Sequence, residues 1–246
     1  MSQASNKVAI VTGASRGIGA AIAERLARDG FAVAVNYAGS KAAADAVVAR
    51  IGSTGGRAIG VQGDVSDPAA VRALFDAAEK AFGGVDVLVN NAGVMALKPI
   101  ADSDDAMFDR MMAINLKGTF NGMREAAKRL RNGGRIINFS TSVVGTKLEN
   151  YSIYAATKAA VETLTAIAAK ELRGRSITVN AVAPGPTGTD LFFEGKSQEL
   201  IDRMAKASPL ERLGTPEDIA GVVAFLAGPD GAWVNAQVIR ANGGLV

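Results

Sequence analysis

Tyr154 and Lys158 are the residues whose types and spacing point most directly to chemistry. They lie four positions apart in an alanine-rich stretch, and positions i and i+4 share one face of a helix, so phenol and ammonium can point into one cleft. A free tyrosine, with a pKa of about 10, is a poor acid–base group at neutral pH, and a nearby lysine cation lowers that pKa. A half-buried tyrosine beside a lysine that extends to solvent has the same spacing. Tyr151, two turns before Lys158, is the weaker candidate.

The composition limits which groups can transfer protons. The 246 residues contain no His and no Cys, 48% are hydrophobic, 21% are charged and the net charge is +3. This balance is typical of a globular protein with a full core. Without His or Cys, proton transfer near neutral pH must use another group, and we expect no bound metal. Basic and acidic residues are interspersed, so we expect no nucleic-acid partner.

A glycine-rich turn follows the first apolar run and opens directly into a helical pattern. Gly13 allows the tight turn, Gly17 lets the backbone approach a pyrophosphate, and Gly19 allows close packing of the helix. The start of that helix offers unpaired N–H groups and a positive dipole end to phosphates. A turn between a strand and a helix at the start of the domain predicts a dinucleotide site. The expected contacts are Gly13, Ser15, Arg16, Gly17, Ile18 and Gly19.

The end of the second strand indicates which nicotinamide cofactor is bound. A site for NAD places Asp or Glu there to hold the ribose 2′-hydroxyl, whereas this sequence has Asn36, Tyr37 and Ser40 and no carboxylate. Arg16 can pair with a 2′-phosphate, and a solvated surface arginine is the alternative interpretation of this residue. We therefore expect NADP(H), with Asn36, Tyr37 and Ser40 among its contacts.

Short runs rich in Val and Ile alternate with longer Ala-rich stretches along the chain. Runs that are apolar throughout fit a sheet covered on both faces, and strand–helix–strand repetition predicts parallel strands. No linker divides the chain, so we expect one domain over residues 1–246, an α/β Rossmann-type doubly wound sheet of seven parallel strands. The expected strands are Val8–Val11, Ala32–Asn36, Ala58–Gln62, Val85–Asn90, Arg135–Ser140, Ile177–Ala183 and Trp233–Arg240. The expected helices are Ile18–Arg28, Lys41–Ile51, Ala69–Phe82, Ala106–Arg131, Ile153–Leu172 and Pro216–Leu226.

Two of these patterns, Gly-x-x-x-Gly-x-Gly in the turn and Tyr-x-x-x-Lys from Tyr154, resemble those of the short-chain dehydrogenase/reductase family. The resemblance covers about Lys7 to Gly244 and implies a carbonyl reductase or alcohol dehydrogenase that uses NADP(H). It implies that Tyr154 transfers the proton, while Lys158 tunes Tyr154 and holds the nicotinamide ribose. It also assigns Asn115 to a catalytic tetrad, in which it kinks its helix and holds a water that relays protons to the lysine. An exposed helix asparagine is the alternative for Asn115.

The family also has a catalytic serine upstream of the tyrosine, and this sequence offers three hydroxyls, at Ser140, Thr141 and Ser142. The family spacing, about thirteen residues, falls on Thr141, while the Val-Val-Gly that follows favours Ser142. Alternation along a strand places Ser140 and Ser142 on one side and Thr141 on the other. We predict that Ser142, with Ser140 as second choice, stabilises the substrate oxyanion.

Three further motifs at strand ends match the family's cofactor site. By resemblance, Asp64 and the backbone of Val65 contact the adenine, although Asp64 could equally cap the next helix. Asn90 would stabilise the central sheet, the alanine and glycine after it would follow the ribose, and Thr189 would bind the carboxamide. The expected contacts are Asp64, Val65, Asn91, Ala92, Gly93, Pro184, Gly185, Thr187 and Thr189.

The segment from about Gly185 to Pro216, here called the lid, is rich in loops and becomes amphipathic near Ser197–Ala207. Long insertions at the carboxyl edge of a parallel sheet often close over a site. We therefore expect the lid to lie on the substrate side. A surface helix that only packs against the domain is the alternative.

Residues 36–40 and the loop at Ser142 look most like those of 3-oxoacyl-[acyl-carrier-protein] reductases, which implies a 3-oxoacyl thioester substrate. Asn242 stands where the family usually has Asp, and the basic carrier-binding surface has no residue-by-residue match. A free ketone, aldehyde or quinone is the alternative substrate, and a non-catalytic NADP(H) sensor is the alternative from another class. The family commonly forms homotetramers, and no signal-peptide pattern or membrane span is present. We therefore expect a cytoplasmic homo-oligomer with a small-molecule substrate.

Overall fold

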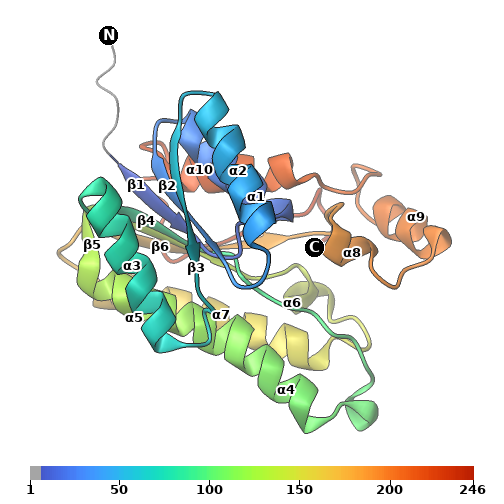
Figure 1. Ribbon diagram of the computed structural model, residues 1–246. Coiled ribbons are helices and arrows are strands. Elements are labelled where there is room, and N and C mark those ends of the chain that lie inside the picture. The colour runs from blue at the N-terminus through green and yellow to red at the C-terminus, as the bar shows by residue number, and fades with distance from the viewer. Residues whose placement is uncertain (1–6) are drawn as a thin grey trace.

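Seven strands form one parallel sheet in the computed structural model, which describes residues 7–246 (Figure 1). The strand order is β3-β2-β1-β4-β5-β6-β7, and the winding reverses between β1 and β4. Such a reversal opens a crevice at the carboxyl edge of the sheet, where ligands of this fold class bind. The predicted fold class is confirmed. The strands are β1 (Val8–Val11), β2 (Ala32–Tyr37), β3 (Arg57–Gln62), β4 (Val85–Asn90), β5 (Leu130–Phe139), β6 (Thr178–Pro184) and β7 (Val238–Ala241).

Helices cover both faces of the sheet, with α1, α2 and α10 on one face and α3, α5 and α7 on the other (Figure 1). The longer helices are α1 (Gly17–Arg28), α2 (Lys41–Ser53), α3 (Pro68–Phe82), α5 (Gly118–Arg129), α7 (Ser152–Glu171), α9 (Gln198–Lys206) and α10 (Pro216–Ala227). Shorter ones are α4 (Asp105–Met111), α6 (Val143–Thr146) and α8 (Asp190–Phe193), with a 3-10 turn at Ile100–Asp102.

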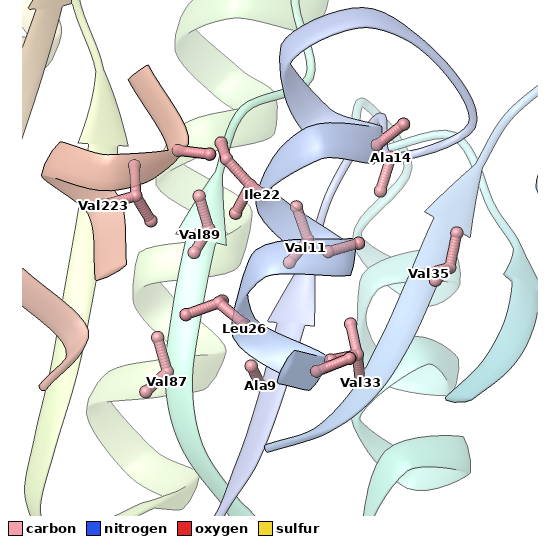
Figure 2. Packing of buried hydrophobic residues seen from close by; sticks show 14 of the residues in the cluster. Ala9, Val11, Ala14, Ile22, Leu26, Val33, Val35, Val87, Val89 and Val223 are labelled. Atoms are coloured by element: carbon pink, nitrogen blue, oxygen red, sulfur yellow. The ribbon is translucent and has the colours of Figure 1, made fainter. Parts of the chain in front are cut away.

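The core beneath α1 fixes the position of the glycine-rich turn. Ile22 and Leu26 of α1 and Val223 of α10 have no exposed surface and pack against strands β1 and β4 (Figure 2). Full burial of each such side chain contributes about 1.5–3 kcal/mol to stability. The start of α1 is therefore held rigidly above the end of β1.

The predicted helix Ala106–Arg131 is divided into three parts. Between α4 and α5 the chain forms a π-helical segment, Met112–Lys117, and α5 ends at Arg129 instead of Arg131. The hydroxyl of Thr119 donates to the carbonyl oxygen of Asn115 at 2.8 Å. A side chain therefore bonds to a backbone carbonyl near the end of the π-helical segment. Side chains that insert into the backbone ladder are a recognised cause of such widening.

Two predicted strands differ at their ends. β5 begins at Leu130, but its register against β4 shifts before Arg135, and Gly133 has a φ of 81°. The last strand begins at Val238, five residues after the predicted start at Trp233. Trp233 is 99% exposed and Ala236 has a φ of 59°, a turn conformation that no strand accommodates. Apolar composition alone had suggested a strand there.

Candidate active site

The glycines after β1 lie where no side chain would fit. Gly13 and Gly17 have φ values of 62° and 55°. A Cβ on Gly13 would be 2.8 Å from the Cα of Ala92, and a Cβ on Gly19 would be 2.4 Å from the carbonyl oxygen of Gly13. The residue before α1 is Arg16, and its side chain makes no capping bond, whereas Ser40, Asp67 and Thr215 cap α2, α3 and α10. The first turn of α1 therefore keeps its N–H donors for an anion, as a dinucleotide pyrophosphate requires.

Polar side chains from neighbouring strands hold this turn in place. Asn91 donates from Nδ2 to the carbonyl oxygens of Thr12 (2.9 Å) and Gly13 (3.1 Å). The hydroxyl of Thr12 accepts from the backbone N–H groups of Asn91 and Ala92, both at 3.0 Å. Thr12 is a functional residue that the sequence reasoning missed. A threonine at the end of a buried strand, next to the glycine turn, was the available signal.

Asn36 and Tyr37 face the protein interior, which corrects their predicted role as cofactor contacts. Asn36 is 2% exposed, accepts from the N–H of Gly13 at 3.3 Å and donates to the carbonyl oxygens of Val61 and Gly63. Tyr37 is 5% exposed and belongs to the core cluster beneath α1 and α2. Asn36 therefore positions the turn. Arg16 and Ser40 are exposed, in keeping with a contact at the cofactor's outer end.

The Asp64–Val65 segment lies between the end of β3 and α3. Asp64 accepts from the N–H of Ser66 at 2.8 Å, and Asp67, not Asp64, caps α3 by accepting from the N–H of Ala69. The helix-cap alternative for Asp64 is therefore wrong. Val65 is 7% exposed, and its carbonyl oxygen accepts from Asn121 at 2.9 Å.

Asn115 fastens the loop after β4 to the π-helical segment. Its side chain is fully buried, accepts from the N–H of Val94 at 2.8 Å and donates to the carbonyl oxygen of Val94 at 2.9 Å. This excludes the exposed-asparagine alternative. A Cβ on Gly93 would lie 3.3 Å from the Asn115 Oδ1 and 3.6 Å from the Lys158 Nζ. The backbone of Gly93 therefore lies next to the side chains of both Asn115 and Lys158.

Lys158 and Tyr154 project from the same face of α7 into the site, as their spacing predicted. Lys158 is 4% exposed, and its Nζ donates to the carbonyl oxygen of Phe139 at 2.8 Å. Its ammonium lies 5.9 Å from the centre of the Tyr154 ring. Burial lowers the pKa of Lys158 to about 8. The alternative of a lysine that extends to solvent is therefore wrong.

Burial raises the pKa of Tyr154 to about 12, against a smaller lowering effect of a hydrogen bond with Thr141. The Lys158 ammonium donates to the carbonyl oxygen of Phe139 at 2.8 Å and not to the phenol. The phenol therefore stays protonated at neutral pH and can act as a proton donor. The ring of Tyr151 packs edge-on against it, with centroids 6.3 Å apart.

Thr141, the residue before the predicted Ser142, is the hydroxyl that lowers the pKa of Tyr154, and its oxygen also accepts from the N–H of Val143 at 3.3 Å. Ser140 donates to Glu162 Oε1 at 2.6 Å, and Ser142 donates to the carbonyl oxygen of Ala183 at 3.2 Å. The N–H groups of Ser140 and Ser142 both donate to β6, to the carbonyl oxygens of Val182 and Pro184, so the pairing with β6 continues past Phe139, the last residue of β5. The choice among the three hydroxyls stays a prediction, and the family spacing together with the pKa effect on Tyr154 favours Thr141.

The loop after β6 joins the cofactor turn to the lid. Thr189 caps α8, accepting from the N–H of Phe192 at 3.2 Å, and a Cβ on Gly17 would lie 3.5 Å from its Cγ2. Thr187 is 5% exposed and donates to the carbonyl oxygen of Gly185, so its hydroxyl faces inward. This corrects the prediction for the Thr187 side chain and leaves Thr189 beside the phosphate-binding turn.

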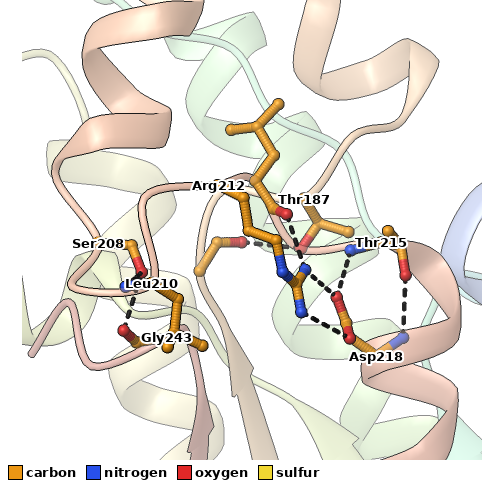
Figure 3. A network of polar contacts seen from close by, with 9 residues as sticks. Thr187, Ser208, Leu210, Arg212, Thr215, Asp218 and Gly243 are labelled. Carbon is orange, nitrogen blue, oxygen red and sulfur yellow. Dashed lines mark hydrogen bonds and ion pairs between the residues drawn. The ribbon is translucent and has the colours of Figure 1, made fainter.

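The two ends of the lid are fastened to each other. Gly188 N–H donates to the carbonyl oxygen of Gly214, and Gly214 N–H donates to that of Pro186, both at 2.9 Å. Beyond this junction, Arg212 pairs with Asp218 at 2.6 Å and lowers the pKa of that carboxyl group to about 2 (Figure 3). The predicted amphipathic segment forms α9, which has no fully buried residue and is capped by Ser197.

The parallel sheet, the uncapped α1 turn and the Tyr154–Lys158 face define an oxidoreductase that uses NADP(H). A family model described as enoyl-(acyl carrier protein) reductase matches residues 13–246. The chain is 50% identical over 250 residues to a short-chain type dehydrogenase/reductase of Picea abies, covering 98% of this chain and 92% of the relative. The protein therefore belongs to the short-chain dehydrogenase/reductase family.

Two further similarities concern the cofactor. The chain is 46% identical over 254 residues to a chloroplastic NADPH-dependent aldehyde reductase-like protein of Arabidopsis thaliana, covering 98% of this chain and 94% of the relative. A short-chain dehydrogenase from Burkholderia cenocepacia, solved in complex with NADP, is 40% identical with a TM-score of 0.93, covering 98% of each chain. These relatives support the NADP(H) prediction.

No helix within residues 7–246 is long and apolar enough to cross a membrane.

Proposed function

We propose that this protein reduces aldehydes or ketones to alcohols with NADPH. The observation that carries the proposal is that Tyr154 and Lys158 project from one face of α7, with the Lys158 ammonium 5.9 Å from the centre of the Tyr154 ring and held by the carbonyl oxygen of Phe139. NADPH supplies the hydride when it is bound. The phenol of Tyr154 donates the proton to the substrate oxygen, and the Thr141 hydroxyl donates a second hydrogen bond to it.

The positions of the other residues give each a role in this reaction. The free N–H groups at the start of α1 hold the pyrophosphate, with Ser15, Gly17, Ile18 and Gly19 in the turn. The backbone of Ala92, Gly93 and Pro184–Gly185 lies at the carboxyl edge, where the nicotinamide half would bind, and Thr189 reaches it from the lid. Lys158 holds the ribose hydroxyls, and Asn115 keeps Gly93 and the lysine together.

A free carbonyl compound is favoured over an acyl-carrier thioester. The basic carrier-binding surface has no residue-by-residue match in this sequence, and Arg129 at the end of α5 is already paired with Asp76 and Glu79, each at 2.6 Å. The Arabidopsis relative is described as an aldehyde reductase. The test is NADPH oxidation with simple aldehydes, ketones, quinones and acetoacetyl thioesters. No oxidation with any of them would favour the non-catalytic sensor and contradict the proposal.

Arg16 is proposed to select NADPH by pairing with its 2′-phosphate. We expect R16A to raise the KM for NADPH by about tenfold and to leave the KM for NADH unchanged, because only NADPH carries that phosphate. R28A, which removes an exposed arginine further along α1, is the matched control. Steady-state kinetics with both cofactors would contradict the assignment if the wild type preferred NADH, or if R16A affected both cofactors equally.

We further propose that the protein forms homotetramers. Exposed apolar side chains gather at two places, Phe108, Phe120 and Ile167 on α4, α5 and α7, and Phe225, Trp233 and Val238 around α10 and β7. Two such regions suit the two interfaces of a tetramer. Light scattering should give about four times the chain mass of 25.2 kDa, and W233E should give a smaller species. A monomeric wild type would refute this.

A cytoplasmic location stays a prediction, and the Arabidopsis relative is chloroplastic by description.

A further inference from the structure

Asn242 lies where four segments around the site meet. It follows β7, and its Cα would be 2.8 Å from a Cβ placed on Gly185, in the loop after β6. Its Nδ2 donates to the hydroxyl oxygen of Ser142 at 2.9 Å and to the carbonyl oxygen of Val246 at 3.2 Å. Its Oδ1 accepts from the N–H of Gly244 at 3.1 Å. One amide group therefore joins the loop after β5 to the last residues of the sequence.

The bond to Ser142 bears on the reacting hydroxyl next to it. Ser142 accepts from Asn242 and donates to the carbonyl oxygen of Ala183, so both its donor and an acceptor site are used. Ser140, on the other side of Thr141, is held by Glu162. Thr141 lies between these two anchored serines, and its own hydroxyl oxygen accepts from the N–H of Val143 at 3.3 Å.

The segment after Asn242 continues this connection to the lid. The hydroxyl of Ser208 donates to the carbonyl oxygen of Gly243 at 2.8 Å (Figure 3). A Cβ on Gly244 would lie 3.1 Å from Pro209, and one on Gly145 would lie 2.8 Å from the side chain of Val246. The end of the lid, the last residues of the sequence and α6 are thus packed around Asn242.

We propose that Asn242 is a positioning residue, which acts through Ser142 to hold the loop after β5, and with it the hydroxyls of Thr141 and Ser142, in its place in the site. This rests on the proposed carbonyl reduction. Asn242 touches no reacting atom and acts through Ser142. An aspartate at this position can accept from the Ser142 hydroxyl if that hydroxyl turns away from the carbonyl oxygen of Ala183, but it cannot donate to Val246, so N242D should keep a connection to Ser142 and lose the one to Val246.

The experiment compares N242A, S142A, the double variant and N242D with wild type in NADPH-dependent carbonyl reduction. N242A and S142A should each lower kcat by about tenfold, the scale of one lost hydrogen bond, with the KM for NADPH little changed. The kcat of the double variant should be no lower than that of the less active single variant, since Asn242 acts through Ser142. N242D should recover most of kcat. N132A removes an exposed side chain near the start of β5 that accepts from Arg175, and serves as the control asparagine.

Hydrogen exchange of the free protein gives a second readout that needs no turnover. Amides in residues 141–146 should exchange faster in N242A than in wild type and N132A. The proposal would be overturned if N242A had the same kcat and the same exchange rates as wild type. It would also be overturned if the double variant lost the product of the two single-variant losses in kcat. A wild type that reduces no carbonyl, with faster exchange in N242A, would instead refute the proposed function and keep the loop connection.

Discussion

The Tyr154→Phe variant should reduce carbonyl substrates about a thousandfold more slowly than wild type, within the range of general acid catalysis. Phenylalanine keeps the ring and removes only the hydroxyl. The lost group is the proton donor, because burial raises its pKa to about 12 and holds it protonated at neutral pH. The ring touches α7 and Tyr151, so the fold and the cofactor turn should be undisturbed.

The measurement is the single-turnover rate with NADPH, together with the Kd for NADPH from its fluorescence. Y154F should bind NADPH nearly as tightly as wild type. Y151F tests the rival tyrosine, and we expect it to retain most of the rate. Substantial turnover by Y154F, or a larger loss in Y151F, would move the proton donor away from Tyr154.

The second large effect is expected at Thr141. T141V keeps the branched shape and removes the hydroxyl, and it should lower kcat about a hundredfold, the usual result of losing one oxyanion donor. T141S keeps the hydroxyl and should stay within a few-fold of wild type. The physical reason is that the Thr141 hydroxyl is the group that lowers the pKa of the Tyr154 phenol, so we expect it to lie within reach of a carbonyl oxygen placed against that phenol.

Substrate kcat and KM for T141V, T141S and S140A would distinguish the three hydroxyls. S140A should lower kcat less than T141V does, because the Ser140 hydroxyl donates to Glu162 and is not free to bind the substrate. If T141V kept full activity while S142A lost a hundredfold, Ser142 would be the oxyanion donor after all.

Most of the fold could be predicted from sequence because its signals are periodic. The apolar runs of the sheet and the Gly13–Gly19 turn follow local rules of burial and backbone freedom. The π-helical segment at Asn115 could not be predicted, since its cause is a tertiary pairing with Val94 together with the Thr119 hydroxyl. The last strand was placed too early because Trp233, although apolar, lies outside the core.

In the candidate site too, some residues could be predicted from the sequence and others could not. Tyr154 and Lys158 were found because four residues are one helical turn, and the helix fixes their common face. The choice between Thr141 and Ser142 could not be made from the sequence, because the hydroxyl directions there are set by Glu162, Ala183 and Asn242, which are distant in sequence. Asn36 and Tyr37 were misplaced because composition does not tell which side of a buried strand end faces the cofactor.

The junction between Thr187 and Gly214 has a consequence for how this protein could diversify. Since Thr187 and Gly214 form a parallel bridge, residues 189–213 leave and return at one pair of residues, and a change of length within them need not strain the strands beneath. Apart from Ser208 and Pro209, which contact the segment after β7, most of this excursion can be exchanged between relatives while α7 and the turn after β1 stay as they are. A change of substrate can then arise by recombination at two neighbouring points, with the hydride and proton chemistry inherited intact.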